Sequence, residues 1–193
     1  MASENFVRPA RSSSSMMCTI ELNGASRSIL ISTTMSLLLE SSALRSPIAE
    51  RLAGGMPAFG TCAGLILLAG DILDGRPDQR SFGVIDLAGR RNGYGRQLDS
   101  FETDIDVVGL DGGPVHAVFI RAPIVESTGD AVEVLATVDD RPVLCRQGPI
   151  VVAAFHPELS DDTTVHEYFL RLAAERSPNT PSLSGRVVQN SSR

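Results

Sequence analysis

The sequence predicts an α/β fold, a sandwich with a mostly parallel sheet and some antiparallel additions. Three observations lead to this prediction. An apolar run at residues 56–59 passes through a small-residue turn into a second apolar run at 63–69, which is typical of a strand followed by a helix. A continuous apolar run at 150–155 has the composition of a buried strand. Short apolar segments between residues 132 and 155 are separated by turn residues, which favours a closing antiparallel meander.

The other elements follow in chain order from local signals. Ser32 begins a helix that fades at residues 41–42, and Pro47 suits the first turn of a second helix that ends at Gly54 and Gly55. From Gly70 onward we expect a loop. Strands are predicted at 56–59, 82–87, 101–108, 115–120, 132–137, 142–146 and 150–155, and further helices at 63–69 and 163–176.

The two ends of the chain differ from the rest in composition. Residues 1–28 carry Arg8, Arg11 and a serine run, without an apolar core, and we expect a disordered or non-native leader there rather than a transit peptide. Residues 177–193 are rich in serine, asparagine and proline, which predicts a disordered tail. The folded domain is therefore expected at residues 29–176.

Composition and charge exclude several classes of protein. A net charge of −6 argues against a general nucleic-acid surface, and no apolar run has the length of a membrane span. The three cysteines give no paired framework, and three histidines give no metal-ligand cluster, so neither a metal nor a cofactor is expected. A thiol enzyme of the cytoplasm fits these bounds.

The most informative segment is Gly-Thr-Cys-Ala-Gly at residues 60–64. It places Cys62 on a sharp turn between a strand and a helix, where small neighbours leave a nucleophile accessible. The positive end of the helix dipole favours the reactive thiolate. The alternative is a small buried cysteine in an ordinary connection between a strand and a helix.

A second segment supplies the partners that a nucleophilic cysteine needs. His156, Pro157 and Glu158 directly follow the apolar strand at 150–155. His156 can take the proton of the Cys62 thiol, and Glu158 can orient the imidazole. If both strands lie in a parallel sheet, the two segments meet at its carboxyl edge, where open α/β folds place their active sites. Taken alone, His156 could instead be a capping or surface histidine.

Several segments together resemble one family. They are Phe-Gly-Thr-Cys-Ala-Gly-Leu-Ile-Leu-Leu-Ala at 59–69, Gly-Arg-Gln-Leu-Asp-Ser-Phe-Glu at 95–102, Val-Phe-Ile-Arg-Ala-Pro at 118–123, Ala-Phe-His-Pro-Glu-Leu at 154–159 and, more weakly, Ser-Thr-Thr-Met at 32–35. The chain resembles the glutaminase subunits of two-component pyridoxal 5'-phosphate synthases, which are class I (triad) glutamine amidotransferases. The resemblance runs from about residue 32 to about residue 175.

This resemblance implies a flavodoxin-like three-layer sandwich that hydrolyses L-glutamine to glutamate and ammonia. The ammonia is expected to pass to a (β/α)8-barrel synthase subunit that makes pyridoxal 5'-phosphate, vitamin B6. The triad is expected to be Cys62, His156 and Glu158. Further roles carried over from the family or suggested by the turn are glutamine binding by Arg91, Ile120, Arg121 and Ser32, and oxyanion stabilisation by the amide N–H groups of Cys62 and Ala63.

The chain departs from the family at its front. The family's first strand and its Gly-Gln-Gly turn have no counterpart here, so the N-terminal strands of the sheet are expected to be missing. Ile29, Leu30 and Ile31 stand where the family has Gly, Gly and Glu in a loop at the glutamine site. Since branched residues do not readily adopt glycine conformations, the departure predicts marginal stability and impaired glutaminase activity. Two alternatives stay open: a degenerate subunit that only docks on the synthase, and another cysteine hydrolase or amidase.

Overall fold

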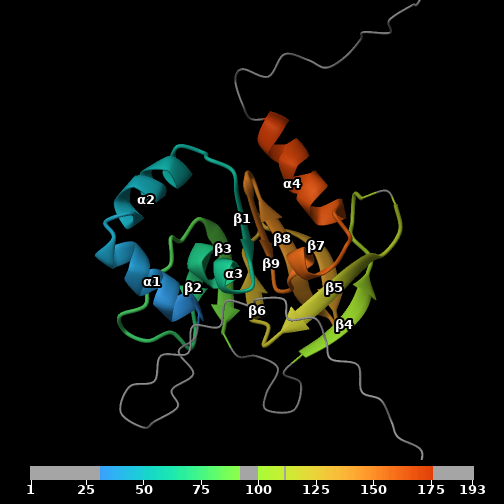
Figure 1. Ribbon diagram of the computed structural model, residues 1–193, viewed down its shortest axis with the longest axis horizontal. Helices are drawn as coiled ribbons and strands as arrows, with labels where there is room; N and C mark the ends of the chain where they lie inside the picture. The colour runs from blue at the N-terminus through green and yellow to red at the C-terminus, as the bar shows by residue number, and fades with distance from the viewer. Residues whose placement is uncertain (1–30, 92–99, 111, 176–193) are drawn as a thin grey trace, which may run out of the picture. The chain divides into compact units, whose positions relative to one another are not determined.

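The computed structural model describes residues 31–91, 100–110 and 112–175 (Figure 1). The predicted leader at 1–28 and tail at 177–193 lie outside the described residues, as do residues 92–99. The described elements, in chain order, are α1 (Ile31–Ser41), α2 (Arg45–Ala53), β1 (Ala58–Thr61), α3 (Ala63–Leu68), β2 (Ala69–Ile72), β3 (Ile85–Arg90), β4 (Ser100–Ile105), β5 (Val115–Ile120), β6 (Ile124–Thr128), β7 (Glu133–Val138), β8 (Arg141–Gln147), β9 (Ile150–Ala153), the 3-10 helix η1 (Pro157–Leu159) and α4 (Thr164–Glu175).

The sheet that carries the predicted nucleophile has the strand order β1-β9-β8-β7. Strands β1 and β9 pair in parallel, with Thr61 opposite Ala153 at their carboxyl ends. The other pairings are antiparallel because tight turns connect the strands. Asp139 and Asp140 both have positive φ between β7 and β8, and Gly148, also with positive φ, begins the turn before β9.

Two further sheets have the orders β2-β3-β6 and β4-β5. Strands β2 and β6 were not predicted from the sequence: Gly70 to Ile72, predicted to lie in a loop, continue the strand that begins at Ala69. Each missed strand has four or five residues and includes exposed positions, so neither shows a clear apolar alternation. Among the described residues, two strand pairings are parallel and four are antiparallel, so the expectation of a mostly parallel sheet was wrong for this part of the chain. The α/β class itself is confirmed.

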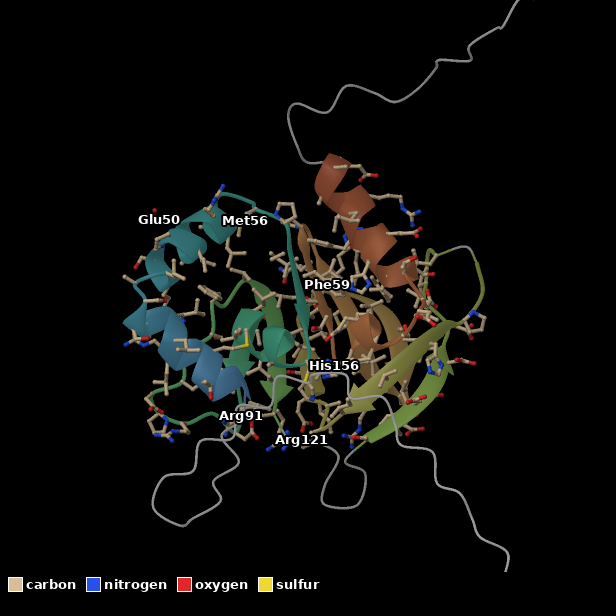
Figure 2. All side chains as sticks on the ribbon, in the orientation of Figure 1. Glu50, Met56, Phe59, Arg91, Arg121 and His156 are labelled. Carbon is tan, nitrogen blue, oxygen red and sulfur yellow. The ribbon has the colours of Figure 1, made fainter. Side chains whose placement is uncertain are left out.

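Helices cover both faces of β1, which gives the predicted layers. Gly60 faces α3, since a Cβ built on it would lie 2.7 Å from the Gly64 backbone and 2.8 Å from Leu68 Cδ1. Phe59, the preceding residue of the strand, has the opposite orientation because side chains alternate. Its ring packs against Phe169 of α4 with centroids 5.5 Å apart (Figure 2). Helix α1 in turn packs on α3.

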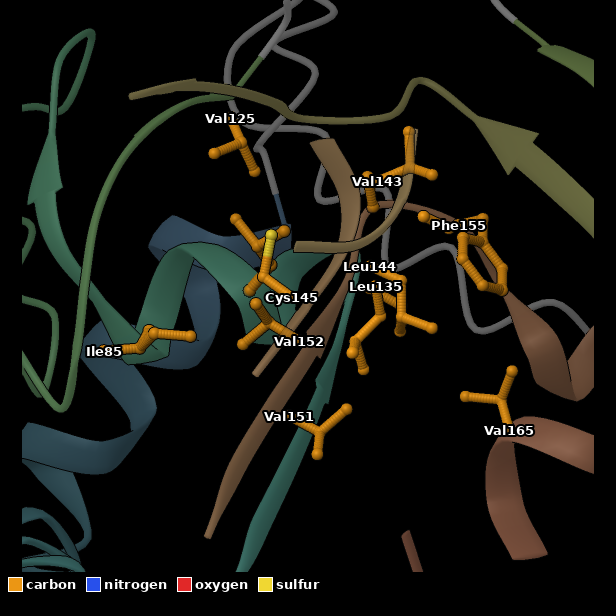
Figure 3. Close-up of a cluster of buried hydrophobic side chains, with 14 of the residues drawn as sticks. Ile85, Val125, Leu135, Val143, Leu144, Cys145, Val151, Val152, Phe155 and Val165 are labelled. Atoms are coloured by element: carbon orange, nitrogen blue, oxygen red, sulfur yellow. The ribbon is translucent and has the colours of Figure 1, made fainter. Parts of the chain in front are cut away.

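The hydrophobic core lies around the central strand β9, all four of whose residues are buried. Aliphatic side chains from β7, β8 and β9 gather there with Phe155 and Val165 (Figure 3). The same cluster includes Cys145, which is fully buried. A strand buried on both faces explains why the apolar run at 150–155 shows no alternation. None of the helices in the described ranges is long and apolar enough to cross a membrane.

Candidate functional site

Cys62 lies directly after β1, on the turn that leads into α3. Its backbone has φ 47° and ψ −102°, a conformation that is rare for a residue with a side chain. The turn is possible because Gly60 lets the start of α3 pack against the strand. Since this packing leaves no room for a Cβ at position 60, the glycine at this position is explained by the close approach of α3 to the strand.

His156 is the third residue after β9, and Cys62 is the first residue after β1. The His156 backbone N–H donates a 2.8 Å hydrogen bond to the Val118 carbonyl oxygen of β5. The imidazole Nδ1 lies 2.8 Å from Glu158 Oε1, and its side chain is 20% exposed. Because Nδ1 is paired with Glu158, the other ring nitrogen, Nε2, is available to contact Cys62. Glu158 therefore makes the contact with the imidazole that its predicted orienting role requires.

The contacts of the His156 ring with Cys62 and Glu158 raise its pKa. The hydrogen bond with Cys62 raises the pKa of His156 to about 9, and the hydrogen bond and charge of Glu158 act in the same direction. Partial burial of the ring opposes this rise without cancelling it. The cysteine, histidine and glutamate singled out from two distant segments thus form one connected group.

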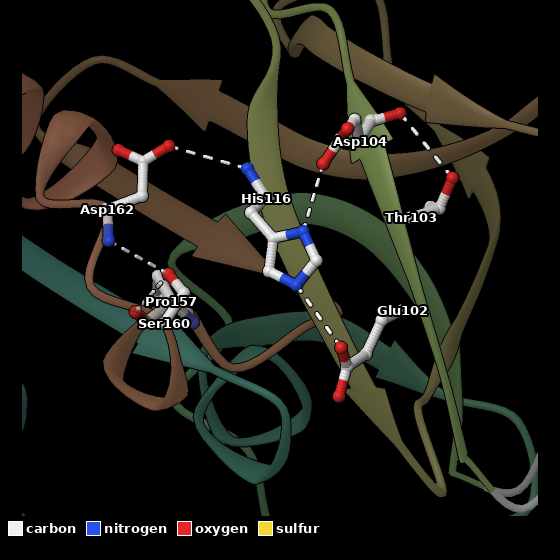
Figure 4. Close-up of polar contacts among 7 residues, drawn as sticks. All are labelled: Glu102, Thr103, Asp104, His116, Pro157, Ser160 and Asp162. Atoms are coloured by element: carbon white, nitrogen blue, oxygen red, sulfur yellow. Dashed lines mark hydrogen bonds and ion pairs between the residues drawn. The ribbon is translucent and has the colours of Figure 1, made fainter.

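The segment that carries His156 and Glu158 is held to its neighbours by Ser160 and Asp162 (Figure 4). Ser160 Oγ donates to the Pro157 carbonyl oxygen at 3.2 Å and accepts from the Asp162 N–H at 3.3 Å. The Asp162 carboxylate accepts the Thr164 N–H at 2.9 Å and the His116 N–H at 3.3 Å. These contacts lower the pKa of Asp162, the largest effect coming from Thr164. They link the turn after β9 to α4 and β5.

Ile120 and Arg121 lie at the end of β5, the strand that holds His156 through Val118. Ile120 is the last residue of the strand, and Arg121 follows with a φ of 43°. Two of the predicted site residues, Cys62 and Arg121, thus share a positive φ at a strand end. Strained residues of this kind cluster at active sites. Both Arg121 and His156 are marked in Figure 2.

Arg91 follows β3, and its guanidinium is held within the chain. Nη1 donates to Gln79 Oε1 at 2.9 Å, Nη2 donates to the Asp74 carbonyl oxygen, and Nε lies 3.4 Å from Asp74 Oδ1. Its side chain is only 11% exposed. The contacts of Asp74 and Gln79 with Arg91 were not predicted from the sequence. Their only signal was a polar segment between two strands, which is common to many loops.

The two predicted oxyanion donors differ in the structure. The Cys62 N–H donates a 2.8 Å hydrogen bond to the Ala153 carbonyl oxygen, so it is engaged in joining β1 to β9. The expectation that this N–H group serves the oxyanion was therefore wrong for this structure. Ala63 is the first residue of α3, and the first N–H groups of a helix have no partner within it. Ser32 lies in the first turn of α1.

Comparison with known proteins places the chain in a family. It belongs to the SNO glutamine amidotransferase family, whose model matches residues 28–175. A crystal structure of a glutamine amidotransferase superposes with a TM-score of 0.69 at 46% identity, covering 74% of each chain. This likeness supports a flavodoxin-like α/β fold, as predicted.

Curated relatives narrow the comparison further. The "Pyridoxal 5'-phosphate synthase subunit PdxT" of Parafrankia sp. (strain EAN1pec) is 56% identical over 141 residues, which cover 73% of this chain and 70% of the relative. The proteins of the same name from Frankia alni and Nocardia farcinica are 55% and 53% identical, covering 72% and 77% of this chain and 70% and 69% of the relatives. The chain is therefore similar to PdxT subunits over most of its length.

Proposed function

We propose that this protein is a glutaminase that hydrolyses L-glutamine to glutamate and ammonia with Cys62, His156 and Glu158. The observation that carries the proposal is the contact of His156 with Cys62 on one side and with Glu158 on the other, at the carboxyl ends of two paired parallel strands. Membership of a glutamine amidotransferase family indicates that the substrate is L-glutamine. A nucleophile, a base and a residue that orients the base are what amide hydrolysis through a covalent intermediate requires.

In the first half of the reaction, the Cys62 thiolate attacks the side-chain amide carbon of glutamine. The new C–S bond moves an electron pair onto the carbonyl oxygen. The imidazolium of His156 then donates its proton to the amide nitrogen, and the C–N bond breaks to release ammonia. A thioester between Cys62 and the glutamyl group remains. The raised pKa of His156 suits this step, because the ring holds the proton that the leaving group needs.

In the second half, water hydrolyses the thioester. Neutral His156 accepts a proton from the water as its oxygen attacks the thioester carbon, and the C–S bond then breaks to release glutamate. The charge that Cys62 regains stabilises the protonated imidazole, so the resting pair is restored. Glu158 keeps Nδ1 protonated throughout, which leaves Nε2 as the atom that exchanges the proton.

The remaining predicted residues have roles in binding. Arg91 and Arg121 supply positive charge for the α-carboxylate of glutamine, and Ile120 borders the substrate through its backbone. The Ala63 N–H is the proposed oxyanion donor on the α3 side. Ser32, in the first turn of α1, is proposed to take part in glutamine binding. These assignments follow the family resemblance, and the positions of Ile120 and Arg121 at the end of β5, the strand that holds His156, support them.

The ammonia that glutamine hydrolysis releases is expected to be used by a partner subunit. The relatives are named as subunits of pyridoxal 5'-phosphate synthase. We therefore infer that this chain acts with a synthase subunit, a (β/α)8 barrel according to the resemblance, which uses the ammonia to build pyridoxal 5'-phosphate. Delivery within a complex protects ammonia from protonation and loss to solvent.

A glutamine analogue with an electrophilic diazoketone in place of the amide tests both recognition and nucleophile. The full chain, mixed with a synthase subunit, is incubated with the analogue and digested for mass spectrometry. We expect one adduct on Cys62, which excess L-glutamine suppresses and which is absent from Cys62→Ala. Labelling that glutamine does not suppress would contradict the proposed substrate.

A further inference from the structure

Asp74 makes two kinds of contact with Arg91, one to its backbone and one to its side chain. Asp74 Oδ1 accepts the Arg91 backbone N–H at 2.8 Å and lies 3.4 Å from the guanidinium Nε. The Asp74 backbone carbonyl oxygen accepts a hydrogen bond from Nη2. Asp74 therefore holds both the backbone of Arg91 and the orientation of its guanidinium.

Gln79 holds the same guanidinium from another position. Its Oε1 accepts a 2.9 Å hydrogen bond from Arg91 Nη1. Gln79 lies five residues after Asp74, so a single connection between β2 and β3 supplies both partners. An arginine side chain has considerable rotamer entropy, and a guanidinium held in advance loses less of it when a carboxylate binds.

The connection that carries Asp74 and Gln79 is itself attached to α1 and α2. Ser36 of α1, the one buried polar side chain among the residues described here, accepts the Arg80 N–H and donates to the Arg80 carbonyl oxygen, both at 3.2 Å. Arg45 donates to the carbonyl oxygens of Arg80 and Ser81. Its guanidinium also lies 4.9 Å from the centre of the Phe82 ring. These contacts attach the segment directly after Gln79, residues 80–82, to α1 and α2.

We propose that Asp74 and Gln79 are positioning residues that hold Arg91 in the orientation in which it binds the α-carboxylate of glutamine. This inference rests on the proposed function, in which Arg91 contacts the substrate. Neither residue contacts the reacting atoms, so their effect falls on glutamine affinity and not on the chemical step.

The test measures glutamine binding without turnover. The full chain carrying Cys62→Ala, mixed with a synthase subunit, is titrated with L-glutamine by calorimetry, and Asp74→Ala and Gln79→Ala are added singly. Loss of a hydrogen bond to a charged group predicts a Kd about tenfold higher for Asp74→Ala. Asp74→Asn keeps the Oδ1 acceptor and should restore most of the affinity. The control is Glu126→Gln, which removes the charge from the exposed 2.7 Å pair with the neighbouring Arg90 and should leave Kd unchanged.

Two further measurements separate positioning from general damage. In an Arg91→Lys background, Asp74→Ala should add little, because the group it positions has already been replaced. With Cys62 restored, Asp74→Ala should raise KM and change kcat less than about twofold. An unchanged Kd, additive effects with Arg91→Lys, or a fall in kcat with KM intact would overturn the inference. Absence of any glutamine binding to the Cys62→Ala chain would instead overturn the proposed function beneath it.

Discussion

The backbone N–H of Cys62 donates a 2.8 Å hydrogen bond to the carbonyl oxygen of Ala153. This bond continues the parallel ladder between β1 and β9 by one residue beyond the last paired position. Because each strand then turns away, the residue after β1 and the residues after β9 lie beside one another. The bond therefore positions the nucleophile against the segment that carries His156, and it assigns the Cys62 N–H to the sheet instead of to the substrate.

The first prediction concerns pH. The folded chain holds the pKa of His156 at about 9, above its ordinary value of 6.5. Because the folded-state pKa is raised, the stability it contributes is fully present below pH 6.5 and is lost as pH rises through about 9. Glutaminase kcat/KM should fall over the same upper limb, since the leaving group loses its proton donor.

Removing either partner of His156 should move this limb to lower pH. An NMR titration of the His156 ring should give a lower pKa in Cys62→Ala than in the unchanged chain, and a smaller decrease in Glu158→Gln, because the Cys62 contact has the larger effect. A His156 pKa that is the same in all three proteins would show that the triad contacts are absent in solution.

The second prediction compares two glycines that flank Cys62. A Cβ at Gly60 would lie within 3 Å of the Gly64 backbone and of Leu68, whereas a Cβ at Gly64 meets nothing within 4 Å. Gly60→Ala should lower the free energy of unfolding by about 1–3 kcal/mol through overpacking. Gly64→Ala, the matched control on α3, should leave it unchanged or slightly higher. Urea unfolding measures both, and equal effects would contradict the close packing of β1 on α3.

The third prediction concerns thiol reactivity. Cys145 is fully buried in the core, and desolvation raises its pKa to about 12. Cys62 is partly exposed on its turn. Brief treatment of the native chain with iodoacetamide at neutral pH should therefore alkylate Cys62 and leave Cys145 unmodified until the chain unfolds. Peptide mapping by mass spectrometry checks this, and rapid modification of Cys145 would show that the core packing described here is wrong.

The fourth prediction concerns the turn after β9. Asp162→Ala removes acceptors for the Thr164 and His116 N–H groups and should cost about 1–2 kcal/mol in unfolding free energy. Since contacts with Thr164 lower the pKa of Asp162, this stability is present above its ordinary value of 3.8 and is lost as pH falls through the lower folded-state value. The exposed neighbour Asp161 provides the control, because Asp161→Ala should have little effect at any pH. If Asp162→Ala were as stable as Asp161→Ala, the contacts of Asp162 with Thr164 and His116 would not stabilise the fold.

The proximity of Cys62, His156 and Glu158 was predictable from sequence because both segments follow apolar strands, and the carboxyl ends of parallel strands meet at one edge of a sheet. The strands β2 and β6 were not predictable, because sheet pairing and not composition makes them strands. The engaged Cys62 N–H was missed for a related reason: nothing in the sequence says which carbonyl lies opposite a given amide. The contacts of Arg91 with Asp74 and Gln79 depend on how one loop folds back, which local sequence does not encode.

The most direct test of the account is ammonia release from L-glutamine by the full chain mixed with a synthase subunit, with Cys62→Ala as the control. We predict release that depends on Cys62, at a rate below that of the Parafrankia relative, since Ile29, Leu30 and Ile31 replace the residues expected in the loop at the glutamine site. Absence of release from a folded chain that binds the synthase subunit would contradict the account, and would support a subunit that only docks.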